Sequence, residues 1–136
     1  MSAVNATATT TATVYVVDDD PSVRRALPRL LRSAGMDAIA FDSLTSLLAT
    51  NLRTEDACIV ADVRLEHEDG LTLPRLLAER GLTIPVVFLT AVDSLDMRDG
   101  ALHAGGAAFF RKPVDDQALI DAIRWALARE RSESPR

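Results

Sequence analysis

Short apolar runs alternate with longer amphipathic segments along this chain. Five runs rich in Val, Ile or Phe have the length of strands, and several are apolar at every position. Because uninterrupted apolarity is typical of strands covered on both faces, the runs predict a parallel sheet. The predicted strands are Thr13–Val17, Asp37–Phe41, Cys58–Ala61, Pro85–Leu89 and Ala107–Phe110.

The segments between these runs have helical spacing. Pro21 to Ala34 carries its apolar residues on one face and is followed by Gly35, a typical helix stop. We expect Pro28 to kink this helix, because proline removes a backbone hydrogen bond. The alternation predicts an α/β three-layer sandwich with a five-stranded parallel sheet and five helices. The other predicted helices are Ser43–Leu52, Leu71–Arg80, Ser94–Ala104 and Asp115–Arg131.

Composition narrows the class of protein. The 136 residues are 48% hydrophobic, enough for one domain with a real core. The net charge of −5 argues against direct nucleic-acid binding, which needs a basic face. No apolar stretch approaches the roughly 20 residues of a membrane helix. The single cysteine, Cys58, lies in an apolar run and is expected to be a buried small residue.

The two ends of the chain differ from its middle. Residues 1–12 are rich in Ala and Thr and lack the basic start of a secretory signal, so we expect a disordered tail. The domain is expected to span residues 13–131. Residues 132–136 would be a C-terminal tail or the start of a linker. A cytoplasmic location without membrane contact is the expectation.

Four of the five predicted strands end at polar residues with useful chemistry. The first leads into Asp18 and Asp19, the third into Asp62, the fourth into Thr90 and the fifth into Lys112. In a parallel sheet of order 2-1-3-4-5, ligands bind where the strand order reverses, between the first and third strands. The three aspartates are therefore expected to converge on one crevice, flanked by the Thr and the Lys.

Converging carboxylates require a physical explanation. Two negative charges about 5 Å apart repel by roughly 3 kcal/mol at an effective dielectric near 20. Such a site shifts its pKa values or binds a cation, and hard oxygen ligands favour Mg²⁺, with Mn²⁺ as a substitute. A neighbouring Lys and hydroxyl suit phosphoryl chemistry, in which an Asp can be the nucleophile. Asp20, before Pro21, is instead interpreted as a helix N-cap.

These residues also match a known set of motifs, in order and in spacing. Over Thr13 to Arg131 the chain resembles the receiver domains of two-component response regulators, the CheY-like group with a flavodoxin-like fold. The sequence that flanks its motifs is most similar to that of the FixJ/NarL-type subgroup, whose receivers often precede a helix-turn-helix DNA-binding domain. The motifs are Val-Val-Asp18-Asp19, Asp62 in Val-Ala-Asp-Val-Arg, Gly70, Thr90-Ala91, Ala104-Gly105 and Lys112-Pro113.

The resemblance implies a role for each matching position at the acidic crevice. Asp62 would be the phosphoacceptor. Asp19 and Asp62 would ligate Mg²⁺ through their side chains and Arg64 through its backbone carbonyl, while Asp18 would hold a metal-bound water. Lys112 would pair with the phosphoryl oxygens and with the Asp62 carboxylate.

The resemblance also implies a switch and its partners. Thr90 would swing its hydroxyl toward the phosphoryl group, and Phe109 would rotate inward with it. This would alter the face formed by the fourth helix, fifth strand and fifth helix, where such domains form homodimers or meet partners. The donor would be a sensor histidine kinase or a phosphotransfer protein. The domain would assist its own phosphorylation and dephosphorylation and would not be an enzyme.

Three local features depart from the family or leave its pattern open. The stretch Leu65–Asp69 lacks the usual proline and adds three acids, so we expect a more mobile loop beside the metal site. It is either a solvated acidic loop or a segment in which Glu66 or His67 tunes metal affinity or phosphoryl lifetime. Gly106 stands where Ala is frequent and should loosen its turn. Trp125 either faces a protein partner or packs on a neighbouring strand.

Two other classes of function are compatible with parts of the sequence. A phosphatase of the haloacid-dehalogenase type would use Asp18 as nucleophile and Asp20 as acid, but it would leave Asp62 unused and the chain is short for such an enzyme. A receiver-like docking module would signal without phosphorylation. The complete set of Asp18, Asp19, Thr90 and Lys112 argues against that second alternative.

Overall fold

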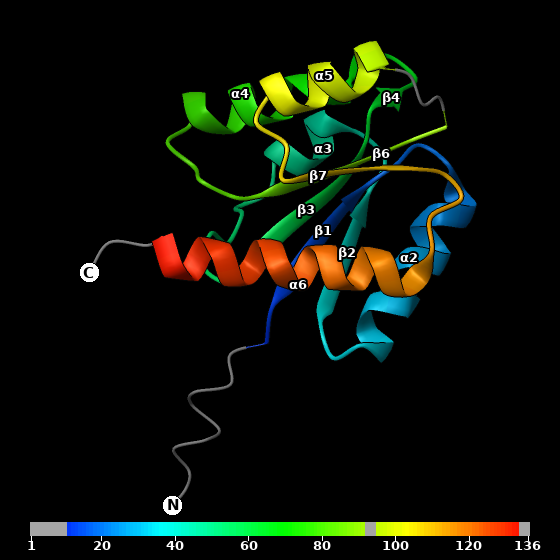
Figure 1. Ribbon diagram of the computed structural model, residues 1–136, viewed down its shortest axis with the longest axis vertical. Coiled ribbons are helices and arrows are strands. Elements are labelled where there is room, and N and C mark those ends of the chain that lie inside the picture. The colour runs from blue at the N-terminus through cyan, green and yellow to red at the C-terminus, as the bar shows by residue number, and fades with distance from the viewer. Residues whose placement is uncertain (1–10, 92–94, 134–136) are drawn as a thin grey trace, which may run out of the picture.

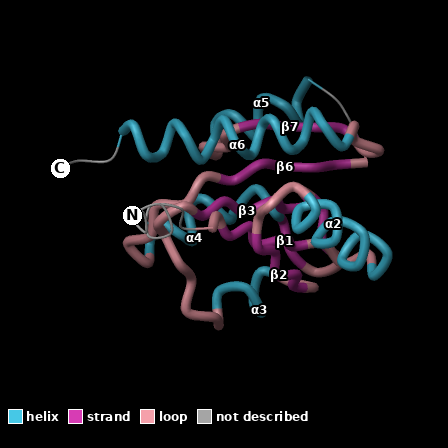
Figure 2. Tube along the Cα trace, turned by 90° about the horizontal axis from the view of Figure 1, so that it is seen from below, coloured by secondary structure: helices cyan, strands magenta, loops and turns pink. Residues whose placement is uncertain are grey.

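The computed structural model, which describes residues 11–91 and 95–133, contains a five-stranded parallel sheet. Figure 2 shows the strands side by side in the order β2-β1-β3-β6-β7. In chain order this is the predicted 2-1-3-4-5, so the predicted topology is confirmed. The strands are β1 (Thr13–Val17), β2 (Asp37–Phe41), β3 (Ala57–Asp62), β6 (Val86–Thr90) and β7 (Ala108–Arg111).

Helices cover both faces of the sheet and complete a three-layer sandwich (Figure 1). One face carries α2 and α6, and the other carries α3, α4 and α5. A short 3₁₀ turn, η1, leads into α4. The bounds are α2 (Pro21–Ser33), α3 (Leu44–Leu48), η1 (Gly70–Thr72), α4 (Leu73–Glu79), α5 (Leu95–His103) and α6 (Asp116–Glu133).

The central strands explain the uninterrupted apolar runs of the sequence. Every residue of β1 and β3 is buried. Alternate side chains point to opposite faces, so Val14 and Val16 join the cluster under α2 and α6, whereas Tyr15 and Val17 join the cluster under α3 and α4. Both faces of β1 therefore lie in the core, and Cys58 of β3 is buried there as expected.

Some predicted boundaries shift in the structure. Three strands extend one residue further than predicted, so Asp62, Thr90 and Arg111 are themselves the last strand residues. The second helix is much shorter than predicted and ends at Leu48, and the third divides into η1 and α4. Helix α2 is uninterrupted across the buried Pro28. The predicted helix start at Ser94 and most of the predicted N-terminal tail lie outside the described residues.

The segment after β3, where we expected a more mobile loop, has regular structure. It forms a two-stranded antiparallel hairpin of β4 (Arg64–Leu65) and β5 (Glu68–Asp69). Leu65 is buried, and the Gly70 N–H donates to the carbonyl of Val63 at 2.7 Å and closes the base of the hairpin.

In the described part of the chain, no helix combines the length and the apolarity that crossing a membrane requires.

Candidate functional site

The structure brings three aspartates together at the carboxyl ends of β1 and β3. The two strands are neighbours in register, with Val17 opposite Ala61, so Asp18 and Asp62 follow at adjacent positions. Asp18, Asp19 and Asp62 each offer a carboxylate oxygen, and these oxygens lie within 4.8 Å of one another. Asp18 and Asp62 are buried, whereas Asp19 is exposed. The crevice is thus partly desolvated and open on one side.

Lys112 reaches this cluster from the far strand of the sheet. Its Nζ atom lies 2.8 Å from Asp18 Oδ2 and 3.1 Å from Asp62 Oδ2. Its backbone N–H donates to the Thr90 carbonyl at 2.7 Å, which fixes the chain just beyond β7. The ammonium therefore bridges the two buried carboxylates.

Burial and charge shift the proton affinities in this cluster. Burial raises the pKa of Asp62, the nearby Asp18 charge raises it further, and Lys112 opposes both. Burial alone would lower the pKa of Lys112, but its hydrogen bonds and charge interactions with Asp18 and Asp62 outweigh that effect and raise it. Counted by formal charge, the three carboxylates and one ammonium sum to two negative charges. A divalent cation that prefers oxygen ligands would neutralise the charge of these carboxylates.

The loop between β1 and α2 is held by local contacts. Asp18 Oδ1 accepts from the Asp20 N–H at 2.9 Å, and Arg24 Nη1 donates to the Asp18 carbonyl at 3.0 Å. Asp20 accepts from the Ser22 N–H at 2.9 Å and caps α2, as the sequence predicts. Asp18 is therefore held by residues at and just before the start of α2 as well as by Lys112.

The backbone beyond Asp62 passes very close to that residue. The Arg64 N–H donates to Asp62 Oδ1 at 3.1 Å. Gly70 packs so tightly on this turn that a Cβ atom there would collide with the Asp62 carbonyl oxygen. Glycine is therefore required at position 70 by close approach of two backbone segments.

The two residues expected to form the switch lie on one face of the sheet. Thr90 is fully buried and shares its face of β6 with Phe88, two residues earlier. Phe88 pairs in register with Phe109 of β7, so Phe109 lies on that same face. Phe109 is half-buried, and the guanidinium carbon of Arg98 lies 5.2 Å from the centre of its ring.

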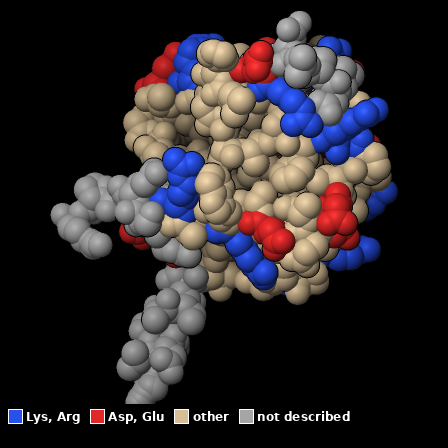
Figure 3. Space-filling model, viewed as in Figure 1, with Lys and Arg blue, Asp and Glu red and all other residues tan. Residues whose placement is uncertain are grey.

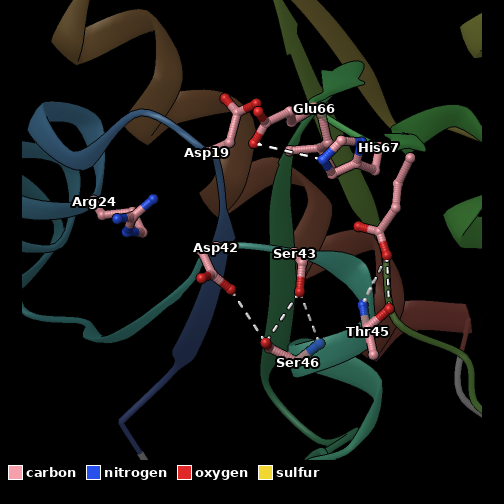
Figure 4. A pocket seen from close by; sticks show the side chains of 10 residues that line it. Asp19, Arg24, Asp42, Ser43, Thr45, Ser46, Glu66 and His67 are labelled. Atoms are coloured by element: carbon pink, nitrogen blue, oxygen red, sulfur yellow. Dashed lines mark hydrogen bonds and ion pairs between the residues drawn. The ribbon is translucent and has the colours of Figure 1, made fainter.

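The acidic stretch of the hairpin does not gather as a whole around the crevice. Glu68 accepts hydrogen bonds from the start of α3, and Asp69 accepts from the Leu71 N–H at 2.9 Å and caps η1. Glu66 and His67 are exposed, and in Figure 4 they border an open pocket together with Asp19. Two of the three added acids are thus helix caps, a role that the sequence alone did not predict.

Two further predictions concern Gly106, which precedes β7, and Trp125 of α6. A Cβ atom on Gly106 would lie 2.7 Å from Cδ2 of the buried Phe88 ring. The glycine therefore makes room for an aromatic ring. From the sequence we expected only that it would loosen the turn. Trp125 is 51% exposed, and the Arg129 guanidinium carbon lies 5.0 Å from the centre of its indole ring. Of the two alternatives for Trp125, the structure favours exposure.

The sheet order and layers are those of the CheY-like fold, and a solved CheY-like receiver domain from Methanospirillum hungatei has the same fold, with a TM-score of 0.81 at 21% identity, covering 92% of this chain and 100% of that chain. The model of the response regulator receiver domain family matches residues 14–124. The chain belongs to that family.

Individual relatives agree with this assignment. The chain is 40% identical over 120 residues to the transcriptional regulatory protein TdiR of Thauera aromatica, covering 88% of this chain and 53% of that protein. It is 39% identical over 124 residues to nodulation protein W of Bradyrhizobium diazoefficiens, covering 91% and 55%. The solved response regulator StyR has a TM-score of 0.80 at 39% identity, covering 90% of this chain and 64% of StyR. The chain spans about half the length of the curated relatives it matches.

The chain is therefore a receiver domain of two-component systems, homologous to transcriptional regulators. Receiver domains bind Mg²⁺ at an acidic pocket and interact with sensor kinases. This structure contains a cluster of three aspartates, Asp18, Asp19 and Asp62. The family match does not support the phosphatase alternative. The carboxylate of Asp20, which that alternative needs as an acid, caps α2.

Proposed function

We propose that Asp62 accepts a phosphoryl group and that the resulting acyl phosphate is the signal carried by this domain. The observation that carries the proposal is the position of the Asp62 carboxylate. One oxygen contacts Lys112 Nζ and the other contacts the Arg64 N–H, at the mouth of the crevice shared with Asp18 and Asp19.

The residues present fit a magnesium ion. Asp19 and Asp62 would hold it with their side chains, Arg64 with its backbone carbonyl and Asp18 through a water, and Mn²⁺ would substitute. The fit rests on the converging hard oxygen donors and on their net negative charge, which Lys112 only partly offsets. When bound, the ion neutralises charge on the phosphoryl oxygens.

Phosphoryl transfer at this site is a nucleophilic displacement at phosphorus. An Asp62 oxygen attacks the phosphorus of a phosphohistidine on a sensor kinase or phosphotransfer protein. The O–P bond forms as the N–P bond breaks, and the electron pair returns to the imidazole nitrogen of the donor. Lys112 then pairs with a phosphoryl oxygen. Hydrolysis later restores the Asp62 carboxylate and releases inorganic phosphate.

The output is proposed to pass through the face of α5, β7 and α6. Thr90 turns its hydroxyl toward the phosphoryl group and Phe109 moves inward, which changes the surface available for a homodimer or an output domain. Like its relatives named as transcriptional regulators, the whole protein would then control transcription in the cytoplasm. On the face seen in Figure 3 acidic and basic side chains are interspersed, so this segment is not proposed to bind DNA itself.

Incubation with acetyl phosphate and Mg²⁺ tests the proposal. Intact-mass spectrometry should show one added phosphoryl group on the wild-type protein and none on Asp62→Asn. Asp37→Asn makes the same chemical change at an exposed position at the opposite end of the sheet and should be modified normally. Modification of Asp62→Asn to the wild-type extent would overturn the assignment. Steady turnover of a phosphomonoester that survives this substitution would instead support a phosphatase.

A further inference from the structure

Glu68 joins the hairpin beside the phosphoacceptor to a helix distant in sequence. Its Oε1 accepts from the Leu44 N–H at 2.7 Å. Its Oε2 accepts from the Thr45 N–H at 3.2 Å and from the Thr45 hydroxyl at 2.7 Å. Figure 4 shows Thr45 across the open pocket from Asp19 and Glu66. One carboxylate thus receives three hydrogen bonds from the first two residues of α3.

These contacts complete the capping of a very short helix. The first N–H groups of any helix lack partners within the helix itself. In α3, the Ser43 side chain accepts from the Ser46 N–H at 3.0 Å, and Glu68 takes the N–H groups of Leu44 and Thr45. A negative charge at a helix N-terminus also interacts favourably with the helix dipole. The position of Glu68 is therefore fixed by charge as well as by geometry.

The carboxylate is ionised at neutral pH. Partial burial raises the pKa of Glu68, but the hydrogen bonds from Thr45 and Leu44 outweigh it and hold the pKa below its usual value, against a smaller opposing effect of the Asp42 charge. The three hydrogen bonds are consequently charge-assisted, which makes each of them stronger than a bond between neutral groups.

The other end of this connection is the phosphoacceptor loop. Within the hairpin, Glu68 pairs in register with the buried Leu65, and Asp69 pairs with Arg64. The Arg64 N–H in turn donates to Asp62 Oδ1 at 3.1 Å. A continuous series of contacts therefore runs from α3 through the hairpin to the carboxylate of Asp62.

We propose that Glu68 is a positioning residue of the phosphoacceptor site, because its tie to α3 holds the hairpin and with it the Arg64 backbone. The inference rests on the proposed function of Asp62, since it concerns the cation and phosphoryl group accepted there. Glu68 itself touches neither group. It acts by fixing a backbone segment that does.

Two simpler roles for Glu68 make different predictions. As a cap alone, it would stabilise α3 without affecting Asp62. As a nearby negative charge alone, it would attract the cation wherever the hairpin lay. Glu66 provides the control for charge, because it lies two residues away on the same hairpin, is 75% exposed and contacts His67 at 4.0 Å.

Magnesium binding, measured by isothermal titration calorimetry, separates these roles. Glu68→Ala should raise the Kd for Mg²⁺ about 10-fold, the lower end of the effect seen for residues that orient metal ligands. Thr45→Val keeps every charge and removes one of the three contacts, so it should raise the Kd by a smaller factor. The double variant should bind no more weakly than Glu68→Ala, because both changes break one connection. Glu66→Gln should leave the Kd within about twofold, as expected for an exposed charge.

Amide hydrogen exchange of the metal-free protein gives a second readout that needs no ligand. Glu68→Ala should accelerate exchange at Leu44 and Thr45 and also at Arg64, whereas Glu66→Gln should accelerate none of them. Acceleration confined to Leu44 and Thr45, with an unchanged Kd, would show a helix cap and overturn the proposal. An equal weakening of Mg²⁺ binding by Glu66→Gln and Glu68→Ala would overturn it in favour of simple charge.

Failure of this inference differs from failure of the proposed function. If the wild-type protein accepts no phosphoryl group from acetyl phosphate, the function proposed for Asp62 is wrong whatever the variants show. If it does accept one and Thr45→Val and Glu68→Ala behave as wild type in both measurements, only the role of Glu68 is wrong. Thr45→Val also guards against misfolding, because it leaves the hairpin sequence intact.

Discussion

The two loops that flank the phosphoacceptor are held in different ways. The loop between β1 and α2 is held at Asp18 by the Phe41 carbonyl and by Lys112, and from there into α2 by contacts that span no more than six residues. The hairpin loop after β3 is fixed by Glu68, whose partners on α3 lie 23 and 24 residues earlier in the chain. The helix end of the first loop is therefore built locally, whereas the hairpin depends on a second element of the fold.

This difference determines how each loop responds to a substitution. A change at Asp20 loses hydrogen bonds only to Ser22, two residues away, at the start of α2. A change at Glu68 or Gly70 acts on the hairpin as a whole, because Glu68 ties it to α3 and Gly70 closes its base. The site should accordingly be more sensitive to substitution on the hairpin side.

The largest effect is expected for Gly70→Ala, which adds a Cβ atom where the hairpin passes closest to Asp62. The added Cβ collides with the Asp62 carbonyl, so the loop must move or the strand end must distort. Overpacking against backbone should lower the free energy of unfolding by about 3 kcal/mol, which urea denaturation measures. Gly100→Ala is the control, because its Cβ would meet only the flexible Leu71 side chain at 3.2 Å. If Gly70→Ala were as stable as the wild-type protein, the loop would be able to move and accommodate the Cβ atom without cost.

The locally built parts of the molecule are those that the sequence predicts best. Buried strands appear as apolar runs, and the strand order then brings Asp18, Asp62 and Lys112 to one edge of the sheet. The cap formed by Asp20 lies directly before its helix and is predicted by position alone. Each of these features depends on residues that are neighbours in the chain or on a rule that applies to all parallel sheets.

The features that escaped prediction depend on contacts between distant residues. Glu68 stands in an acidic stretch that has the composition of a solvated loop, and nothing near it in the sequence indicates α3 as its partner. Gly106 shows its packing role only when the ring of Phe88 is placed against it. Both segments were expected to be loose because they depart from the family pattern, and the structure shows long-range contacts at Glu68 and Gly106.

A smaller effect concerns Asp62, which lies between the two loops. Its pKa is raised in the folded protein, first by burial and then by the Asp18 charge, with Lys112 opposing. Ionised Asp62 therefore costs stability at neutral pH, and the cost disappears as the pH falls through the folded pKa toward the ordinary value of 3.8. Metal-free Asp62→Asn should unfold at a higher Tm than wild type at pH 7, with the difference shrinking toward pH 4.

Magnesium provides the control for this prediction. Because the ion binds only the folded site, it should raise the Tm of the wild-type protein more than that of Asp62→Asn and so narrow the gap. Differential scanning calorimetry with and without Mg²⁺ measures both effects. A metal-free Asp62→Asn that is less stable than wild type at pH 7 would mean that Lys112 outweighs burial at this carboxylate.

The smallest effects come from the helix caps, which distinguish the two loops most directly. Asp20→Ala removes the local cap of α2 and should lower the Tm slightly at pH 7. Hydrogen bonding to Ser22 lowers the pKa of Asp20, so this loss of stability should vanish as the pH falls below the ordinary value of 3.8. Ser43→Ala removes the cap of α3 and should cost about 1 kcal/mol. Only Ser43→Ala should also weaken Mg²⁺ binding, because Glu68 holds the hairpin through that same turn of helix. Equal effects of the two variants on the Kd for Mg²⁺ would contradict the distinction between a locally built helix end and a remotely anchored hairpin.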